Sequence, residues 1–275
     1  MRILTTALVA AATTACGLAN AADEIGPMDQ RVWVRVSAFD PSISSGAQVD
    51  SPGSGASGTA IDFERDLGLP KKKTLPTLLI GTRFRDAWRA EFEYFQLNRS
   101  GSQTLDQDIV FNGSTFLISN PTTTRFASSV YRASIGYSFV KTPQDEFGVT
   151  AGAHVTHLDI VIDSQTLVAG AAVSTNHAEQ DRTLPLPTLG LYGSHAFAPA
   201  WVASGQVNAF QVKSRGYDGH LFDMQANLLW RATPNVGLGL GYRYDDYKLT
   251  STRDDFHGRV NYQFKGPQLF LEAAF

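Results

Sequence analysis

The feature that most constrains the fold of this chain is an alternation of apolar and polar residues with a period of two. The segment 236–249 shows it clearly, with Leu238 and Leu240 on one face and Arg243 and Asp245 on the other. This period predicts β-strands with one apolar and one polar face. We predict strands over 31–39, 75–84, 88–98, 124–140, 146–160, 184–197, 201–213, 220–231, 236–249, 255–264 and 268–275.

The connections between these strands fall into two classes that alternate along the chain. Short turns are predicted at 85–87, 141–145, 198–200, 233–235 and 265–267, whereas three of the other connections are long loops, at 40–74, 99–123 and 161–183. Short turns at one end and longer loops at the other are typical of β-barrels that span a membrane. The sequence therefore predicts an all-β protein, a transmembrane antiparallel up-and-down β-barrel with long extracellular loops.

The composition favours strands over helices as the elements that cross the membrane. Only 18% of the 275 residues are charged, compared with about 25% in soluble domains. No apolar run after residue 22 approaches the roughly 20 residues that a membrane-spanning helix needs. The formal net charge of −3 gives no indication of a nucleic-acid partner.

The first 21 residues are predicted to be a signal peptide. Arg2 gives a basic start, an apolar stretch follows, and Ala19-Asn20-Ala21 has the small-x-small pattern of a cleavage site. We expect residues 22–275 to form the barrel domain after export. Cys16, the single cysteine, would leave with the signal peptide, so no disulfide is expected. A lipoprotein cleaved just before Cys16 is the alternative.

Aromatic residues recur beside the predicted short turns. Amphipathic rings at strand ends form a girdle where a barrel meets the membrane interface. The alternative is that these rings cap the core of a soluble barrel, which does not explain their placement at turn after turn. The predicted girdle consists of Phe84, Trp88, Phe139, Phe147, Phe197, Trp201, Trp230 and Phe264.

The polar face of the strands carries arginines and carboxylates, whereas the lysines fall in turns, loops or strand ends. Guanidinium groups suit confined pairing with carboxylates better than ammonium groups do. We therefore predict a lumen crossed by ion-pair networks; the alternative is that the charges line open water. The predicted network consists of Arg35, Arg83, Arg89, Glu91, Glu93, Arg132, Asp223, Arg231, Arg243, Asp245, Arg259 and Glu272.

The C-terminal run 269–275 alternates and ends on an aromatic residue, with Leu271, Ala273 and Phe275 on one face. It resembles the terminal strand of Gram-negative outer-membrane β-barrel proteins, and in size the chain is similar to the small OmpW-like and OmpA-like barrels. The resemblance implies a monomer in the outer membrane, surrounded by outer-membrane lipids. It also implies that periplasmic chaperones and the barrel assembly machinery, which reads the last aromatic residue, act on the chain during biogenesis.

The strand count is ambiguous because eleven predicted strands do not make the even number usual in bacterial barrels. Adding 58–64 as a strand gives twelve, which we favour because of the terminal Phe275. Ending the barrel at Phe264 gives ten, the next alternative, and eight is less favoured.

The sequence says less about activity than about fold. Lipid-modifying barrels that resemble this architecture place His and Ser two residues apart, whereas here His154 is followed at that spacing by Thr156. We predict no cofactor, no metal site and no catalytic residues. The leading hypothesis is a structural or porin-like barrel that passes a small solute to a limited extent. The alternatives are an interaction or adhesion protein acting through its long loops, and a lipid-active hydrolase or acyltransferase.

Overall fold

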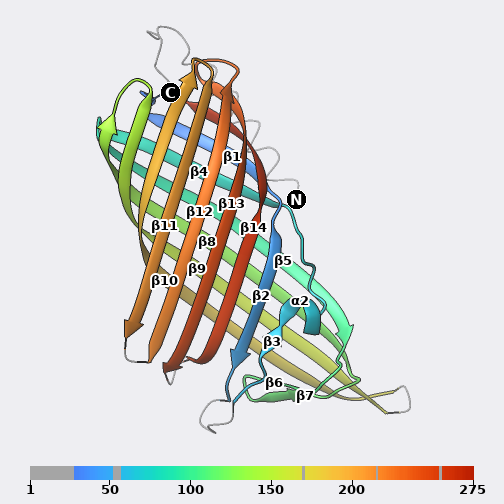
Figure 1. Cartoon of the computed structure of the whole chain (residues 1–275). Helices are drawn as coiled ribbons and strands as arrows, with labels where there is room; N and C mark the ends of the chain where they lie inside the picture. The colour runs from blue at the N-terminus through green and yellow to red at the C-terminus, as the bar shows by residue number, and fades with distance from the viewer. Residues whose placement is uncertain (1–27, 52–56, 169–170, 215, 254–255) are drawn as a thin grey trace.

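The computed structural model describes residues 28–51, 57–168, 171–214, 216–253 and 256–275, and these are mostly β-strand (Figure 1). The predicted signal peptide lies outside the described residues. The one helix that they contain is the short α2 (Phe63–Asp66). The strands are β1 (Val32–Phe39), β2 (Ser42–Val49), β3 (Ile61–Asp62), β4 (Leu75–Arg85), β5 (Trp88–Thr104), β6 (Ile109–Phe111), β7 (Ser114–Phe116), β8 (Pro121–Lys141), β9 (Asp145–Val168), β10 (Ala171–Ala198), β11 (Trp201–Ser214), β12 (Tyr217–Arg231), β13 (Val236–Arg253) and β14 (Phe256–Ala274).

Ten strands form a closed antiparallel ring in the order β1-β4-β5-β8-β9-β10-β11-β12-β13-β14, and β14 pairs back onto β1. The first strand is interrupted at Asp40 and Pro41 and resumes as β2. β14 pairs with both parts, with β1 through 268–274 and with β2 through 258–265. The antiparallel up-and-down barrel predicted from the sequence is therefore confirmed.

The favoured count of twelve strands is wrong, because the ring has ten. Ten is the number of the second alternative, but that alternative ended the barrel at Phe264, whereas β14 continues to Ala274. The segment 58–64 contributes only the two residues of β3 before the chain turns into α2. The predicted turn at 265–267 is not a turn, because β14 runs through it without interruption. A Cβ on Gly266 would lie 2.4 Å from the carbonyl oxygen of Asp40. A glycine is thus needed where β14 passes the break between β1 and β2.

The two ends of the barrel differ as the connection lengths predicted. The backbone N–H of Arg31 donates to the carbonyl of Phe275 at 2.5 Å, so the start of β1 and the end of β14 meet. The C-terminus lies at the top of Figure 1, whereas α2, β6 and β7 gather at the opposite end. We call these the short-turn end and the long-loop end.

The polarity of the two faces reverses partway along the strands, which the sequence analysis did not anticipate. On β5 the outer face begins with Trp88, Phe92 and Tyr94 and continues with polar residues, starting at Gln96. The inner face of the same strand changes from charged to apolar at Phe95. β8, β9, β13 and β14 change in the same sense, with inward Val130, Leu158, Leu249, Tyr262 and Phe264 buried near the long-loop end.

The reversal divides the molecule into two sections. The belt section has an apolar outer face and runs from the short turns to the level of Tyr94, Tyr131 and Tyr244. The loop section lies beyond it and has a polar outer face over an apolar interior, as a soluble β-protein does. Its core includes Phe63, Leu67, Phe95, Leu97, Phe111, Phe116, Phe126, Leu158, Ile160 and Phe264.

Aromatic pairs mark the boundary between the sections. The rings of Tyr94 and Tyr131 lie 5.0 Å apart on the outer face, and those of Phe222 and Tyr244 lie 6.1 Å apart. On β13, Val236 and Tyr244 are eight residues apart, or ~27 Å along the strand. A strand tilt of ~40° reduces this to ~20 Å, close to the ~25 Å apolar band of transmembrane barrels.

Seven of the eight predicted girdle residues lie exposed on the outer face at the short-turn end. Phe84 and Trp88 pair at 6.4 Å, as do Phe197 and Trp201. The assignment of Phe264 to this girdle is wrong, because its side chain is 0% exposed inside the loop section. Its strand has passed the boundary where the polarity reverses, so an apolar residue there points inward. The seven members in place are Phe84, Trp88, Phe139, Phe147, Phe197, Trp201 and Trp230.

The section boundary predicts how outward-facing residues tolerate charge. Leu240 is 63% exposed in the middle of the belt section, so Leu240→Lys should reduce the free energy of unfolding by ~2–4 kcal/mol. Gln96→Lys, just beyond Tyr94 on the outer face, should change it by less than ~0.5 kcal/mol. Urea unfolding in lipid vesicles, followed by tryptophan fluorescence, measures both. Equal losses from the two variants would contradict the boundary.

Candidate functional site

Five charged side chains meet inside the barrel at the boundary between the two sections. Arg132 on β8 lies 2.9 Å from Glu93 on β5 and 2.5 Å from Asp223 on β12. Arg243 on β13 lies 2.8 Å from Glu93 and 2.7 Å from Asp245. We call Glu93, Arg132, Asp223, Arg243 and Asp245 the central cluster. Because its members come from β5, β8, β12 and β13, it ties together opposite walls of the ring.

Aromatic rings cover the central cluster on the side of the loop section. The guanidinium carbon of Arg243 lies 4.8 Å from the ring centre of Phe95 and 5.5 Å from that of Phe39. Cation–π contacts of this kind favour a desolvated guanidinium. Beyond these rings lies the apolar core of the loop section. Within the described residues, the lumen is therefore blocked twice, by ion pairs and then by packed apolar side chains.

A separate buried ion pair fixes α2 inside the loop section. The guanidinium of Arg99 on β5 lies 2.5 Å from the carboxylate of Glu64 and donates to Ser45 Oγ on β2 at 2.6 Å. Ser45 in turn donates from its backbone N–H and from its hydroxyl to Glu64. A charge-assisted network of this kind holds the helix against two strands that are distant in sequence.

The start of α2 is defined by its capping residue. The side chain of Asp62 accepts hydrogen bonds from the backbone N–H groups of Glu64 and Arg65, which would otherwise lack partners. Partial burial alone would raise the pKa of Asp66. Hydrogen bonds from the Arg65 side chain and from the Asp62 backbone N–H instead hold that pKa below its ordinary value. The four residues of α2 are thereby ordered without the length of a stable isolated helix.

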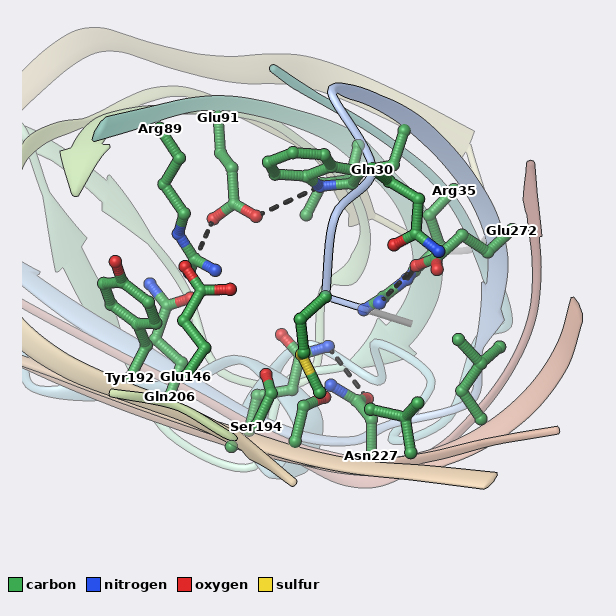
Figure 2. A pocket seen from close by; sticks show the side chains of 18 of the residues that line it. Gln30, Arg35, Arg89, Glu91, Glu146, Tyr192, Ser194, Gln206, Asn227 and Glu272 are labelled. Atoms are coloured by element: carbon green, nitrogen blue, oxygen red, sulfur yellow. Dashed lines mark hydrogen bonds and ion pairs between the residues drawn. The ribbon is translucent and has the colours of Figure 1, made fainter. Parts of the chain in front are cut away.

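A polar cavity of ≈ 120 Å³ lies between the central cluster and the short-turn end. Figure 2 shows Arg89 beside Glu91 on one wall and Arg35 beside Glu272 on another, with Gln30 reaching in from the N-terminal segment. The Arg35–Glu272 distance is 2.6 Å and the Arg89–Glu91 distance is 3.4 Å. The cavity also holds the ion pairs Arg83–Glu146 and Arg231–Glu272, at 2.8 Å and 4.0 Å.

Eleven of the twelve predicted network residues point into the lumen and form ion pairs there. Arg259 does not, because it lies exposed on the outer face of β14 in the loop section, where the polarity has reversed. Adding Glu146 gives six arginines and six carboxylates inside the belt section. An interior with balanced charges has no strong preference for either sign of ion.

The sequence reasoning missed Glu146, Arg99 and Glu64. Glu146 is inward by parity with His154 and Thr156 on β9, so the alternation itself could have identified it. Arg99 shares the parity of Glu93 on β5, but the predicted strand ended one residue before it. Glu64 lies in a helical turn within a predicted loop, where a period of two carries no information.

The geometry around His154 does not activate the hydroxyl of Thr156. Arg132 donates from Nε to His154 Nδ1 at 3.2 Å, so the imidazole proton lies on Nε2. That nitrogen is 3.1 Å from Thr156 Oγ1 and therefore donates to it. A general base would have to accept the hydroxyl proton instead. The pair is a structural hydrogen bond in this arrangement.

The described residues contain no group of three or more His, Cys, Asp or Glu side chains placed to hold a metal ion. No helix in the described part of the chain is long and apolar enough to cross a bilayer. The predicted assembly signal, Leu271, Ala273 and Phe275, lies on the outer face at the end of β14, and its recognition stays a prediction.

The central cluster predicts a large effect of removing one charge. Arg243→Met would leave Glu93 and Asp245 with Arg132 alone, and breaking a buried pair in this way costs about 3–5 kcal/mol. Arg259→Met removes an exposed arginine from the outer face and should cost less than ~0.5 kcal/mol. The midpoint of urea unfolding in vesicles gives both values. Equal stabilities for the two variants would show that the cluster does not support the barrel.

No protein-family model matches the chain, and a search of curated proteins finds no similar sequence. Solved structures do resemble it. The outer membrane protease OmpT from Escherichia coli aligns with a TM-score of 0.57 at 11% identity, over 93% of this chain and 99% of that chain. The Pseudomonas putida toluene transporter TodX gives 0.35 at 11% identity, over 89% and 90% of the two chains. Neisserial surface protein A gives 0.32 at 13% identity, over 89% and 97%.

The likeness to OmpT is the one of these three that is strong enough to bear on the fold, and it extends over nearly the whole of both chains. It agrees with the closed antiparallel ring of strands. The chain therefore has a fold similar to that of this outer-membrane protein, a closed β-barrel with ten strands in the ring.

Proposed function

We propose that this protein is a closed outer-membrane barrel that acts through its surface-exposed loop section as an interaction protein. On this proposal, residues 1–21 direct export, the barrel assembly machinery reads the terminal strand, and the long-loop end faces the cell exterior. Two observations support this proposal. The loop section has its own apolar core beyond the belt section, and ion pairs cross the lumen below it, so a solute has no open path through the barrel.

The blocked lumen argues against the porin-like role that the sequence favoured. A solute passing through would have to separate the ion pairs of Arg132 and Arg243 and then displace the packed rings of Phe39 and Phe95. Separating a buried pair costs several kcal/mol before any apolar packing is lost. The cavity near the short-turn end is a vestibule that ends at the central cluster.

The loop section extends well beyond the belt. From Thr156 to Val168, β9 continues for twelve residues past the boundary, or ~40 Å along the strand. At a tilt of ~40° this raises the end of β9, at Val168, ~30 Å above the belt. Closing the barrel does not require strands of this length. We therefore assign the binding function to the part of β9 and β10 that extends beyond the belt section.

Hydrogen bonds fasten the β6–β7 hairpin to β10 and so make the loop section one rigid surface. The side chains of Asn112 and Ser114 donate to the carbonyls of Glu179 and His177, at 3.2 and 3.3 Å. Asn176 donates back to the carbonyl of Thr115 at 2.7 Å. A surface held in one conformation loses less entropy when a partner binds.

Two apolar residues next to β7 are exposed outside the belt section. Leu117 is 43% exposed and Ile118 is 53% exposed, in a loop that is otherwise polar. Apolar side chains exposed in this way on a rigid surface are candidate anchors for a protein partner. The likeness to a protease is one of fold, and the His154 geometry does not favour extending that activity to this chain.

The first test is electrical. The refolded wild-type protein should give no steady single-channel current in planar bilayers, because both layers of the lumen are closed. Heat-modifiable gel migration of the same sample would show that the barrel is folded. A steady open channel from folded protein would falsify the closed-lumen proposal and restore the porin-like role.

The second test concerns the surface. Ile162 and Ala178 are directly opposite each other, so residues 163–177 can be replaced by Asn-Gly, which favours a tight hairpin turn. Cells displaying the wild type should self-aggregate or adhere to immobilised matrix proteins, and cells displaying the trimmed protein should lose most of that adhesion. The double variant Leu117→Ser/Ile118→Ser should reduce it at least several-fold. Equal adhesion by all three proteins, at equal display, would exclude the loop section as the binding surface.

A further inference from the structure

The backbone pairing between β10 and β11 ends at the edge of the belt section. The two strands pair from Ala198 and Trp201 as far as Leu189 and Ala209, where the pairing ends. Beyond that point β10 pairs only with β9, as far as Ala171, while β11 continues with β12. The loop section is therefore two sheets that separate at this seam, with β10 at the edge of one and β11 at the edge of the other (Figure 1).

The free edge of β10 contains proline at two alternate positions. Pro185 and Pro187 lie just beyond the last paired residue, Leu189, and neither has a backbone N–H to donate. Proline at an edge discourages pairing with another strand. The sequence thus keeps the seam open where a continuous ring would otherwise close it.

An apolar crevice lies inside the loop section, between the sheets that part at this seam. It consists of two hollows of ≈ 30 and ≈ 20 Å³, which share Leu158, Leu184, Leu249 and Val260 as lining residues. The inner hollow is also lined by Leu186, Tyr247 and Tyr262, and the outer one by Val49, Ile160 and Arg182. Neither hollow is lined by a residue of β11 or β12, so these strands do not cover the crevice.

The lipid next to the seam is a source of apolar ligands for the crevice. Leu189 and Leu191, on the outer face of β10, are 67% and 61% exposed and belong to the belt that contacts lipid. The seam begins beside Leu189, so the crevice is adjacent to the level at which lipid chains meet head groups. A narrow apolar crevice gains little from water, because water needs polar partners to occupy a cavity. An alkyl chain matches its apolar lining.

Cationic groups occur where the crevice meets the polar outer part of the loop section. Lys248 lines the inner hollow with a side chain that is 62% exposed, and its Nζ lies 3.2 Å from Asp246. Arg182 lines the outer hollow. Cations beside an apolar slot complement an amphiphile that has an anionic head.

We propose that the loop section binds an acyl chain with an anionic head group, which enters through the β10–β11 seam. The chain lies along Leu158, Leu184 and Leu249, and the head group lies beside Lys248. This proposal is independent of the surface-interaction role, since the crevice lies between the sheets and not on the outer face of the loop section.

A tryptophan reporter tests the proposal. The native tryptophans are Trp33, Trp88, Trp201 and Trp230, and none of them lines either hollow. In the Leu184→Trp variant, held in lipid nanodiscs, 9,10-dibromostearic acid should quench the added fluorescence saturably and near 1:1, with stearic acid competing. In Thr183→Trp, on the outer face next to it, quenching should be weaker and should rise without saturation.

The source of the chain is tested by competition in the Leu184→Trp variant. Relief of quenching by stearate alone indicates a free fatty acid as the ligand, whereas relief by purified lipopolysaccharide as well indicates an outer-leaflet lipid. Either result supports an acyl-chain site. Quenching that neither stearate nor lipopolysaccharide relieves, or that equals the quenching in Thr183→Trp, would overturn the proposed acyl-chain site.

Charge reversal at the crevice gives a second readout. Lys248→Glu should weaken stearate binding about tenfold, whereas Lys265→Glu, an exposed lysine that lines neither hollow, should leave it unchanged. Native mass spectrometry of the unmodified protein with stearate covers the case in which a variant fails to fold. A 1:1 adduct that survives gentle detergent removal is expected, and the absence of any adduct would overturn the proposal.

Discussion

The structure depends on one requirement of the bilayer, that every backbone N–H and C=O at membrane depth be hydrogen-bonded within the protein. The pairing of β1 with β14 meets it, because it joins the two ends of the chain and leaves no edge strand in the belt section. β14 must also reach β2 past the break at Asp40 and Pro41. Gly266 makes that passage possible, so one residue without a side chain lets β14 serve both sections.

Once the ring is closed, the surroundings of each strand decide which residues face inward. Within the belt, lipid accepts the apolar outer face and leaves the interior to charged residues, which then have to pair. Beyond Tyr94 and Tyr244 water lies outside, and the only apolar environment is the interior. β5 therefore carries Glu91 and Glu93 inward in one section and Phe95 and Leu97 inward in the next, without changing its parity.

This reversal explains how far the sequence could predict the molecule. Alternation and connection lengths were enough for the antiparallel barrel, although the terminal Phe275 led to a favoured count of twelve strands where the ring has ten. Parity was enough for most of the charged residues of the lumen. The two misassigned residues, Phe264 and Arg259, both lie on β14 beyond the boundary, where the rule that apolar means outward no longer holds. The contacts of Glu64 with Arg99 and Ser45 could not be predicted, because they join a helical turn to strands distant in sequence.

The two sections are also stabilised by different forces, and this bears on what each can do. The belt section is held by lipid and by ion pairs that connect opposite walls, so opening it would leave buried charges unpaired. Apart from the Arg99–Glu64 pair that holds α2, the loop section is held by apolar packing, which tolerates a change of partner if apolar contact is kept. Its wall can therefore part at the β10–β11 seam without exposing charge. A ligand site is physically less costly there than in the lumen, which places binding in the section that the bilayer does not enclose.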